Sequence, residues 1–347
     1  MKKKVLIVDD SAVVRNLISS ILSTDKDLDV IGSAPDPYIA RDKIVKYNPD
    51  VITLDVEMPR MDGITFLKKL MKHFPIPVVI VSSLTQKGAV TTMKAFEAGA
   101  IEVIAKPEMD IKKGMDIIAA DMIEKVKIAA SAKVMKRVER TGTMLQERTV
   151  LKTRALAQST HKIIAIGAST GGTEAIREVL TRMPADSPGT VIVQHMPEKF
   201  TRAFAERLNE QCAMEVREAR EGDGVYPGTA LIAPGSHHMV LKRSGARYYV
   251  SLNQEAPVFH QRPSVEVLFE SVATYAGPNS VGLIMTGMGA DGAKGLLAMK
   301  EAGAKTIAQD EKSSVVFGMP KEAIKAGAVD KVVSLKDIPQ TLINMCI

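Results

Sequence analysis

The sequence predicts an α/β fold with two doubly wound parallel sheets. In both halves of the chain, short apolar runs alternate with stretches of helical period, as is typical of parallel strands joined by helical crossovers. The 347 residues are enough for about two domains. Between the halves, residues 126–160 carry eight Lys or Arg and two Asp or Glu, with no aromatic residue. This indicates a solvated, partly helical linker, in preference to an arm that binds nucleic acid. We therefore expect domains at 1–121 and 156–347, joined by a basic linker at 122–155.

Five apolar runs in the first half are expected strands. The first is followed by apolar residues at helical spacing, with Ser11 in the position of an N-cap. Helix-like segments separate the others, so the five should form one parallel sheet. The runs are KVLIVDD at 4–10, LDVIGSA at 28–34, DVITLD at 50–55, PVVIVSS at 77–83 and IEVIAKP at 101–107.

Polar side chains follow four of these strands, at the end where ligands bind in parallel sheets. They are Asp9, Asp10, Asp55, Ser82 and Lys106. Clustered carboxylates repel unless a cation joins them, and hard oxygen ligands favour Mg²⁺. A Mg²⁺ site beside a nucleophilic aspartate suits phosphoryl transfer, because metal and lysine neutralise the phosphoryl oxygens. The alternative is that each aspartate merely caps the helix after its strand.

The second half places a serine, a histidine and an aspartate just past expected strands. Ser169 ends HKIIAIGAS, His195 follows TVIVQ, and Asp291 follows SVGLIMTG. A nucleophile, a general base and an orienting carboxylate need this convergence. Each residue also has a simpler reading: Ser169 as an N-cap or phosphate-turn residue, His195 as a strand-end histidine, Asp291 as an N-cap. The order Ser, His, Asp also differs from that of α/β-hydrolases, and no G-x-S-x-G elbow is present.

Residues 215–253 interrupt the alternation of strands and helices. Four short runs separated by Gly-rich turns, EVREAR, TALIAP, HHMVLKR and RYYVSLN, predict antiparallel hairpins. The alternation returns with the expected helix PSVEVLFESVATYA and the strands in AKTIAQD and VVSL. The second domain is therefore expected to be a parallel α/β sheet with an antiparallel hairpin region.

Composition excludes several classes of protein. Two cysteines are too few for a disulfide framework, the start MKKKVLIVDD lacks a signal peptide, and no apolar stretch approaches the roughly 20 residues of a membrane span. We expect a cytoplasmic protein without membrane insertion. The net charge of +6 resides in the linker, so we expect no nucleic-acid binding. No HExxH or CxxC motif supports catalytic zinc, and the adjacent His237 and His238 should point to opposite faces of a strand.

The first half, over roughly residues 1–121, resembles the receiver domain of bacterial response regulators, which is flavodoxin-like. The matching residues are Asp9, Asp10, Asp55, Pro59, Gly63, Ser82 and the Lys106–Pro107 pair. The resemblance implies that Asp55 accepts the phosphoryl group. It also implies that Asp10, Asp55 and the backbone carbonyl of Glu57 bind Mg²⁺ with support from Asp9, and that Ser82 and Lys106 contact the phosphoryl group. Many receivers carry an aromatic switch residue where this chain has Val103.

The second half, over roughly residues 156–347, resembles the catalytic domain of the chemotaxis protein-glutamate methylesterases, which is Rossmann-like. The likeness rests on IGASTGGTEAIR, VQHMP, GDGVYPGTALIAPGSHH, RPSVEVLFES, TGMGADGAKG and SSVVFGMPKEA. It implies a nucleophilic Ser169, a general base His195 and its partner Asp291. Backbone N–H groups near Thr170 and Met288 are the candidates for the oxyanion hole.

The two resemblances together imply a phosphorylation-activated enzyme of chemotaxis adaptation. It would hydrolyse γ-glutamyl methyl esters on chemoreceptors and deamidate receptor glutamines, with a chemotaxis histidine kinase as phosphodonor. The esterase reaction itself would need no cofactor. Two alternatives stay open: a transcription factor, which would need a helix-turn-helix output, and a catalytically silent scaffold that docks on receptors.

Overall fold

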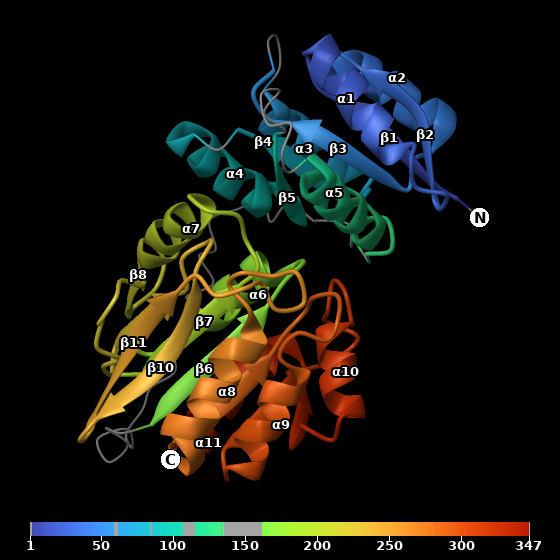
Figure 1. Ribbon diagram of the computed structural model, residues 1–347. Helices are drawn as coiled ribbons and strands as arrows, with labels where there is room; N and C mark the ends of the chain where they lie inside the picture. Colours follow the sequence, from blue (N-terminus) through green and yellow to red (C-terminus); the bar gives the residue numbers. More distant parts are fainter. Residues whose placement is uncertain are drawn as a thin grey trace. The chain divides into compact units, whose positions relative to one another are not determined.

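The computed structural model describes residues 2–58, 62–83, 85–106, 115–132, 134 and 162–346. The chain divides into two compact units, Met1–Gly142 and Thr143–Ile347. Each unit contains one parallel sheet covered by helices (Figure 1). Within the described residues, no helix has the length and apolar character needed to cross a membrane.

The first unit has a five-stranded parallel sheet with the order β2-β1-β3-β4-β5. This is the doubly wound order in which the chain reverses direction between β1 and β3. Its central strands are buried on both faces, which explains why they appear in the sequence as unbroken apolar runs. The strands are β1 (Lys3–Val8), β2 (Leu28–Ala34), β3 (Val51–Asp55), β4 (Val78–Ser82) and β5 (Glu102–Ala105).

Helices lie on both faces of this sheet (Figure 1). Ser11 is the N-cap of the first helix, as predicted, and its hydroxyl accepts a hydrogen bond from Val14 N. The helices are α1 (Ala12–Leu22) and α5 (Met115–Ala129) on one face, and α2 (Pro37–Tyr47), α3 (Gly63–His73) and α4 (Gln86–Ala98) on the other. The right-handed crossovers of a doubly wound sheet require this division.

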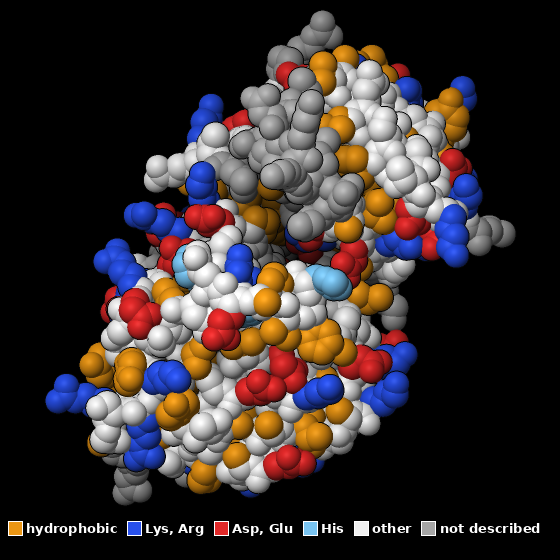
Figure 2. All heavy atoms as spheres, in the orientation of Figure 1, with side chains coloured by type: hydrophobic (Ala, Val, Ile, Leu, Met, Phe, Trp, Pro, Cys, Tyr) orange, Lys and Arg blue, Asp and Glu red, His pale blue; other side chains and the backbone are white. Residues whose placement is uncertain are grey.

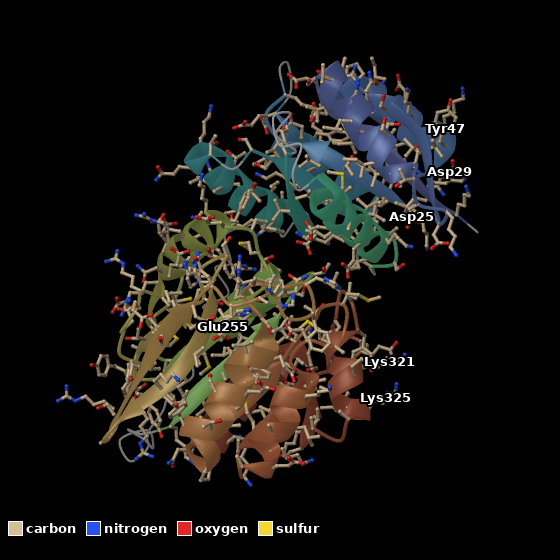
Figure 3. All side chains as sticks on the ribbon, viewed as in Figure 1. Asp25, Asp29, Tyr47, Glu255, Lys321 and Lys325 are labelled. Atoms are coloured by element: carbon tan, nitrogen blue, oxygen red, sulfur yellow. The ribbon has the colours of Figure 1, made fainter. Side chains whose placement is uncertain are left out.

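Helix α5 continues past residue 121, so residues 122–129 of the expected linker are helical. Val126 and Ala129 are fully buried. Lys127 pairs with Asp25 (labelled in Figure 3; 3.2 Å) and Asp27 (2.7 Å) in the loop before β2. The end of α5 is therefore part of the first unit. Residues 133 and 135–155 of the expected linker lie outside the described residues, and the domain limits stay a prediction.

The second unit has a seven-stranded, fully parallel sheet with the order β14-β13-β12-β6-β7-β9-β8. Strand order reverses at β6, which lies between β12 and β7 and is buried along its whole length. The strands are β6 (Ile163–Ala168), β7 (Gly189–Gln194), β8 (Glu215–Glu218), β9 (Thr229–Ile232), β12 (Ser280–Ile284), β13 (Lys305–Gln309) and β14 (Lys331–Val333).

Helices cover both faces of this sheet, and α8 and α9 lie side by side in front of it in Figure 1. Crossovers from β6 towards β8 and from β12 towards β14 run in opposite directions, so right-handedness places their helices on opposite faces. One group is α6 (Gly172–Leu180), α7 (Phe200–Asn209) and α11 (Ile338–Cys346); the other is α8 (Val265–Tyr275), α9 (Ala293–Glu301) and α10 (Met319–Lys325). Short 3₁₀ turns occur at Gly277–Asn279 and Leu335–Asp337.

The predicted hairpin region is half right. Strands β10 (His238–Ser244) and β11 (Arg247–Asn253) form an antiparallel hairpin. The prediction was wrong for β8 and β9, which pair in parallel and extend the main sheet. Residues 219–228 between them provide a crossover rather than a tight turn, and backbone bonds from Gly222 and Val225 tie that crossover to β11. Alternating polarity shows that a segment is a strand, but it does not show the direction in which the strand pairs.

Helix α8 packs closely against strand β6, and a substitution in β6 can test this packing. A Cβ added to Gly167 of β6 would lie 2.2 Å from Cγ1 of Val265, the first residue of α8. We expect Gly167→Ala to lower the free energy of unfolding by about 1–3 kcal/mol through overpacking. Calorimetry of the full chain measures this in the transition of the second unit. Adding Val265→Ala should recover much of the loss, and two strictly additive effects would contradict the proposed clash.

Candidate functional site

The carboxyl end of the first sheet holds an ion-paired cluster. Lys106, just after β5, places Nζ 2.6 Å from Asp55 Oδ2 and 3.3 Å from Asp9 Oδ2. One carboxylate oxygen from each of Asp9, Asp10 and Asp55 lies within 4.8 Å of the others. Asp9 and Asp55 are buried, whereas Asp10 is exposed. The structure therefore brings together the four charged residues that the sequence analysis singled out here.

The aspartates in this cluster are not helix caps, which was the alternative interpretation. Ser11 caps α1 and Asp62 caps α3. Asp9 Oδ1 accepts from Ser11 N (2.9 Å), and Asp55 Oδ1 accepts from Glu57 N (2.9 Å). These short loops hold the carboxylates at the sheet edge.

The cluster has the chemistry of a Mg²⁺ site. Asp9 Oδ2 is buried; Lys106 Nζ is its ion-pair partner at 3.3 Å, but no donor among the described residues makes a well-directed hydrogen bond to it. Burial, and then the nearby Asp55 carboxylate, raise the pKa of Asp9 despite the opposing effect of Lys106. Burial alone would lower the pKa of Lys106, but its bond to Asp55 and the nearby Asp9 raise it. A further positive charge would stabilise these crowded carboxylates, so the residues present fit a hard divalent cation.

Two glycines pack closely against residues at the carboxyl end of the first sheet. A Cβ added to Gly63 would lie 2.6 Å from Asp55 O, and one added to Gly88 would lie 3.1 Å from Ser82 Oγ. Ser82 is buried, and its hydroxyl donates to Gly88 O at 3.4 Å. Helix α4 therefore contacts the predicted phosphoryl-contacting serine directly. Val103, in the position of the aromatic switch residue, is buried. Pro59 and Pro107 lie outside the described residues.

In the second unit, strand register brings Ser169 beside His195. Ala168 of β6 pairs with Gln194 of β7, and Ser169 and His195 are the next residues of the two strands. His195 N donates to Ala168 O (3.1 Å). The side-chain amide of Gln194 donates to the carbonyl oxygens of Ser169 (2.9 Å) and His195 (3.1 Å). Both residues therefore lie where the strand order reverses, which is the usual place for a site in such sheets.

Asp291 completes this arrangement from the loop after β12. Its Oδ2 lies 2.7 Å from His195 Nε2, and both side chains are buried. Because Nε2 faces the carboxylate, Nδ1 is the ring nitrogen left for proton transfer. Ser169 is half-buried at the edge of the site.

Neither Ser169 nor Asp291 is the N-cap of the helix that follows its own strand. Gly171 is the N-cap of α6 and Gly292 that of α9, and neither cap makes a side-chain bond. Asp291 instead accepts hydrogen bonds from the first residues of α8. Ser264 Oγ (2.7 Å) and Glu266 N (2.9 Å) donate to Oδ1, and Val265 N (2.8 Å) donates to Oδ2. The interpretation of Ser169 and Asp291 as N-caps of the helices after their own strands was wrong.

These contacts set the charge of Asp291. Burial would raise its pKa, but the bonds from His195, Ser264 and Glu266 outweigh burial and hold the pKa below its ordinary value. Because the folded-state pKa is lowered, the ionised carboxylate stabilises the fold above the ordinary aspartate range. That stabilisation is lost as pH falls through the folded-state pKa. The imidazole of His195 therefore faces a charged carboxylate at neutral pH.

Sequence reasoning missed the residues that hold Asp291. Ser264 was readable as an N-cap, since it precedes an apolar helical pattern, and it does cap α8. Its hydrogen bond to Asp291 depends on the packing of α8 beside the loop after β12, and no local sequence pattern predicts that packing. Glu266 is also buried and accepts from Gly292 N (3.0 Å), so the two segments bind each other reciprocally.

The structure places Thr170 and the residue before Met288 next to the serine. Thr170 follows it directly and is buried. A Cβ added to Gly287 would lie 2.7 Å from Ser169 Cβ, so the backbone just before Met288 packs against the serine. Gly287 O accepts from Gly318 N (3.0 Å) and Met319 N (2.8 Å), which fixes this loop. The Met288 side chain is 50% exposed.

Comparison with known proteins shows the family of the chain. The pattern of the CheB methylesterase family matches residues 164–342, and that of the response regulator receiver domain matches residues 5–119. The chain belongs to the CheB methylesterase family. A protein-glutamate methylesterase/protein-glutamine glutaminase of Syntrophus aciditrophicus is 58% identical over 344 residues, covering 99% of both chains.

Other relatives give the same result. A protein of the same description from Sulfurimonas denitrificans is 55% identical, over 97% of both chains. The crystal structure of the Thermotoga maritima CheB methylesterase catalytic domain is 37% identical with a TM-score of 0.52, and the match covers 53% of this chain and 98% of that one. These findings confirm the family and the α/β architecture predicted from sequence.

The surface of the second unit carries charges of both signs. On the face shown in Figure 2, acidic and basic side chains are interspersed and no single-sign patch dominates. The described residues of this unit form a parallel sheet with helices on both faces, not a helix-turn-helix output.

The crowded carboxylates of the first unit predict how Mg²⁺ affects stability. At about 100 times its Kd, Mg²⁺ should stabilise this unit by about 2.7 kcal/mol, seen as a rise in Tm by calorimetry. Because the pKa of Asp9 is raised, protons should compete with the metal at higher pH than for an ordinary aspartate of pKa about 3.9. The rise in Tm should therefore shrink as pH falls. Asp9→Asn should weaken it, whereas Asp29→Asn, which changes an exposed residue of β2 (labelled in Figure 3), should not. A rise that Asp9→Asn leaves intact would contradict this site.

Proposed function

We propose that this protein is a phosphorylation-activated hydrolase of chemotaxis adaptation, which removes methyl groups from γ-glutamyl methyl esters of chemoreceptors and deamidates receptor glutamines. The observation that carries the proposal is the contact between His195 and Asp291, 2.7 Å long, at the sheet edge where Ser169 is the next residue on the neighbouring strand. Family membership supports both activities, since the relatives are named methylesterase and glutaminase. We place the protein in the cytoplasm, where it meets the cytoplasmic part of its receptors.

In the first step Ser169 Oγ attacks the ester carbonyl carbon while His195 Nδ1 takes the hydroxyl proton. Asp291 holds the ring in the tautomer with hydrogen on Nε2 and stabilises the imidazolium that forms. Backbone N–H groups at Thr170 and Met288 bind the oxyanion. His195 then protonates the leaving methoxide, and methanol departs from the acyl-enzyme.

In the second step His195 removes a proton from water, which attacks the acyl-enzyme. Collapse of the second tetrahedral intermediate releases the γ-carboxyl group of glutamate, which loses its proton to solvent, and His195 returns its own proton to Ser169. A glutamine substrate follows the same path with ammonia leaving in place of methanol. Nothing in this sequence of steps requires a cofactor.

The first unit supplies regulation. Asp55 accepts a phosphoryl group from a chemotaxis histidine kinase, and Ser82 and Lys106 contact the transferred group. Asp10, Asp55 and the Glu57 carbonyl, supported by Asp9, would hold Mg²⁺, which supplies positive charge to the phosphoryl oxygens. Lys106 already lies 2.6 Å from Asp55, so it is placed to bind a group attached there.

Removal of the nucleophile is the most direct test. Ser169→Ala should reduce methanol release from methylated receptor membranes by several orders of magnitude, because it removes the hydroxyl that forms the acyl-enzyme. Ser251→Ala, on the hairpin strand β11, is the matched control and should retain activity. Activity of Ser169→Ala within about tenfold of the unmodified chain would exclude this serine. A chain that releases no methanol even with a phosphodonor would support the silent scaffold instead.

Phosphorylation is tested separately with acetyl phosphate. Asp55→Ala should abolish Mg²⁺-dependent labelling of the full chain and the increase in esterase rate that accompanies it. Asp62→Asn, which changes the exposed cap of α3, should be labelled normally. Undiminished labelling of Asp55→Ala would rule Asp55 out as the acceptor.

A further inference from the structure

A second buried histidine is hydrogen-bonded to Ser264, one of the residues that donate to Asp291. His238, at the start of β10, is 1% exposed. Its Nδ1 lies 3.2 Å from Ser264 N, and its Nε2 lies 3.1 Å from Ala256 O. A backbone N–H can only donate and a carbonyl can only accept. Nδ1 must therefore be unprotonated, and Nε2 must carry the proton. The ring is neutral, in a single tautomer.

Ser264 connects this histidine to the catalytic centre. Its backbone N–H binds His238 while its hydroxyl donates to Asp291 Oδ1 at 2.7 Å. Besides His195, the groups of the described residues that donate to Asp291 are Ser264 Oγ, Val265 N and Glu266 N. A displacement of Ser264 would therefore move the whole set of donors, and with them the carboxylate that orients His195.

The hairpin holds α8 at two points. His238 binds the residue before the helix, and Leu241 N donates to Ser271 Oγ (2.9 Å) further along it. The two bonds join the same pair of elements, but only the first reaches Asp291. Ser271 also donates to Leu268 O within α8. The bond between His238 and Ser264 can therefore be compared with the bond between Leu241 and Ser271. Both join the hairpin to α8, but only the first connects to the catalytic residues.

We propose that His238 is a positioning residue for the esterase reaction, acting through Ser264 on Asp291. It takes no part in proton transfer, because both ring nitrogens are occupied by backbone groups. Its role is to fix the N-terminus of α8, so that the Asp291 carboxylate stays directed at His195 Nε2. This inference rests on the proposed function for its kinetic test, but not for its structural one.

The kinetic test compares three variants of the full chain, with acetyl phosphate and methylated receptor membranes. His238→Leu removes both ring bonds and should lower kcat about 100-fold, the scale expected for a small displacement of a catalytic group, with KM changed less than about twofold. His238→Asn should recover most of that loss, because its side-chain oxygen can accept from Ser264 N where Nδ1 did. Ser271→Ala should lower Tm and leave kcat unchanged.

A spectroscopic readout separates positioning from general destabilisation. In chains with ¹⁵N-labelled histidine rings, His238 should give the signals of a neutral Nε2–H tautomer. His238→Leu should weaken or abolish the downfield proton signal of His195 Nε2–H bound to Asp291, whereas Ser271→Ala should leave it intact. The signal of His195 is assigned by its loss in His195→Gln.

The outcomes distinguish this inference from the proposed function. If Ser169→Ala is inactive but His238→Leu keeps its kcat and its downfield signal, the positioning role is wrong and the esterase stands. If the unmodified chain releases no methanol, the proposed function fails, and the ring spectra still decide whether His238 controls the His195–Asp291 contact. Equal loss of kcat in His238→Leu and Ser271→Ala would also overturn the inference, since it would reflect stability alone.

Discussion

Asp291 is a charged group in a place where charge is costly. Its side chain is buried, and an ionised carboxylate without partners could not persist there. Four hydrogen bonds, one from His195 and three from the start of α8, stabilise it. To make those bonds, α8 must begin beside the loop after β12, and β7 must end beside both. The positions of three separate segments of the second unit follow from the need to satisfy one carboxylate.

The two units solve the same electrostatic problem in different ways. Both place carboxylates at the carboxyl end of a parallel sheet, where strand order reverses. In the first unit the compensating charge is the long side chain of Lys106, and one buried oxygen of Asp9 lacks a hydrogen bond within the described residues. In the second unit, backbone dipoles and a hydroxyl fix the carboxylate completely. The cluster in the first unit can therefore accept a further charged group, such as a cation. In the second unit, the hydrogen bonds hold the ionised Asp291 carboxylate in one position.

Much of this was accessible from sequence because both sheets are buried and parallel. Buried strands appear as apolar runs, and in parallel sheets the residue after each run lies at a common edge, so Asp9, Asp55, Ser169 and His195 could be placed without a structure. The parallel pairing of β8 with β9 could not be predicted, because the alternation of polar and apolar residues is the same in parallel and antiparallel strands. The bonds from Ser264 to Asp291 and His238 also escaped detection. They depend on the packing of α8 against residues more than twenty positions away.

The central position of β6 has a consequence for how the protein is made. Ile163 of β6 pairs with Ser280 of β12, 117 residues later, so one side of this strand stays open until most of the chain has been synthesised. Closing such a long loop is slow relative to forming local contacts. The first unit has no such delay, since its strands and helices are complete by Ala129 and leave the ribosome first. A chain cut short before Ser280 lacks both the partner of β6 and Asp291. Premature termination therefore cannot release a partly active, unregulated esterase: the regulatory unit is always finished before the catalytic site exists.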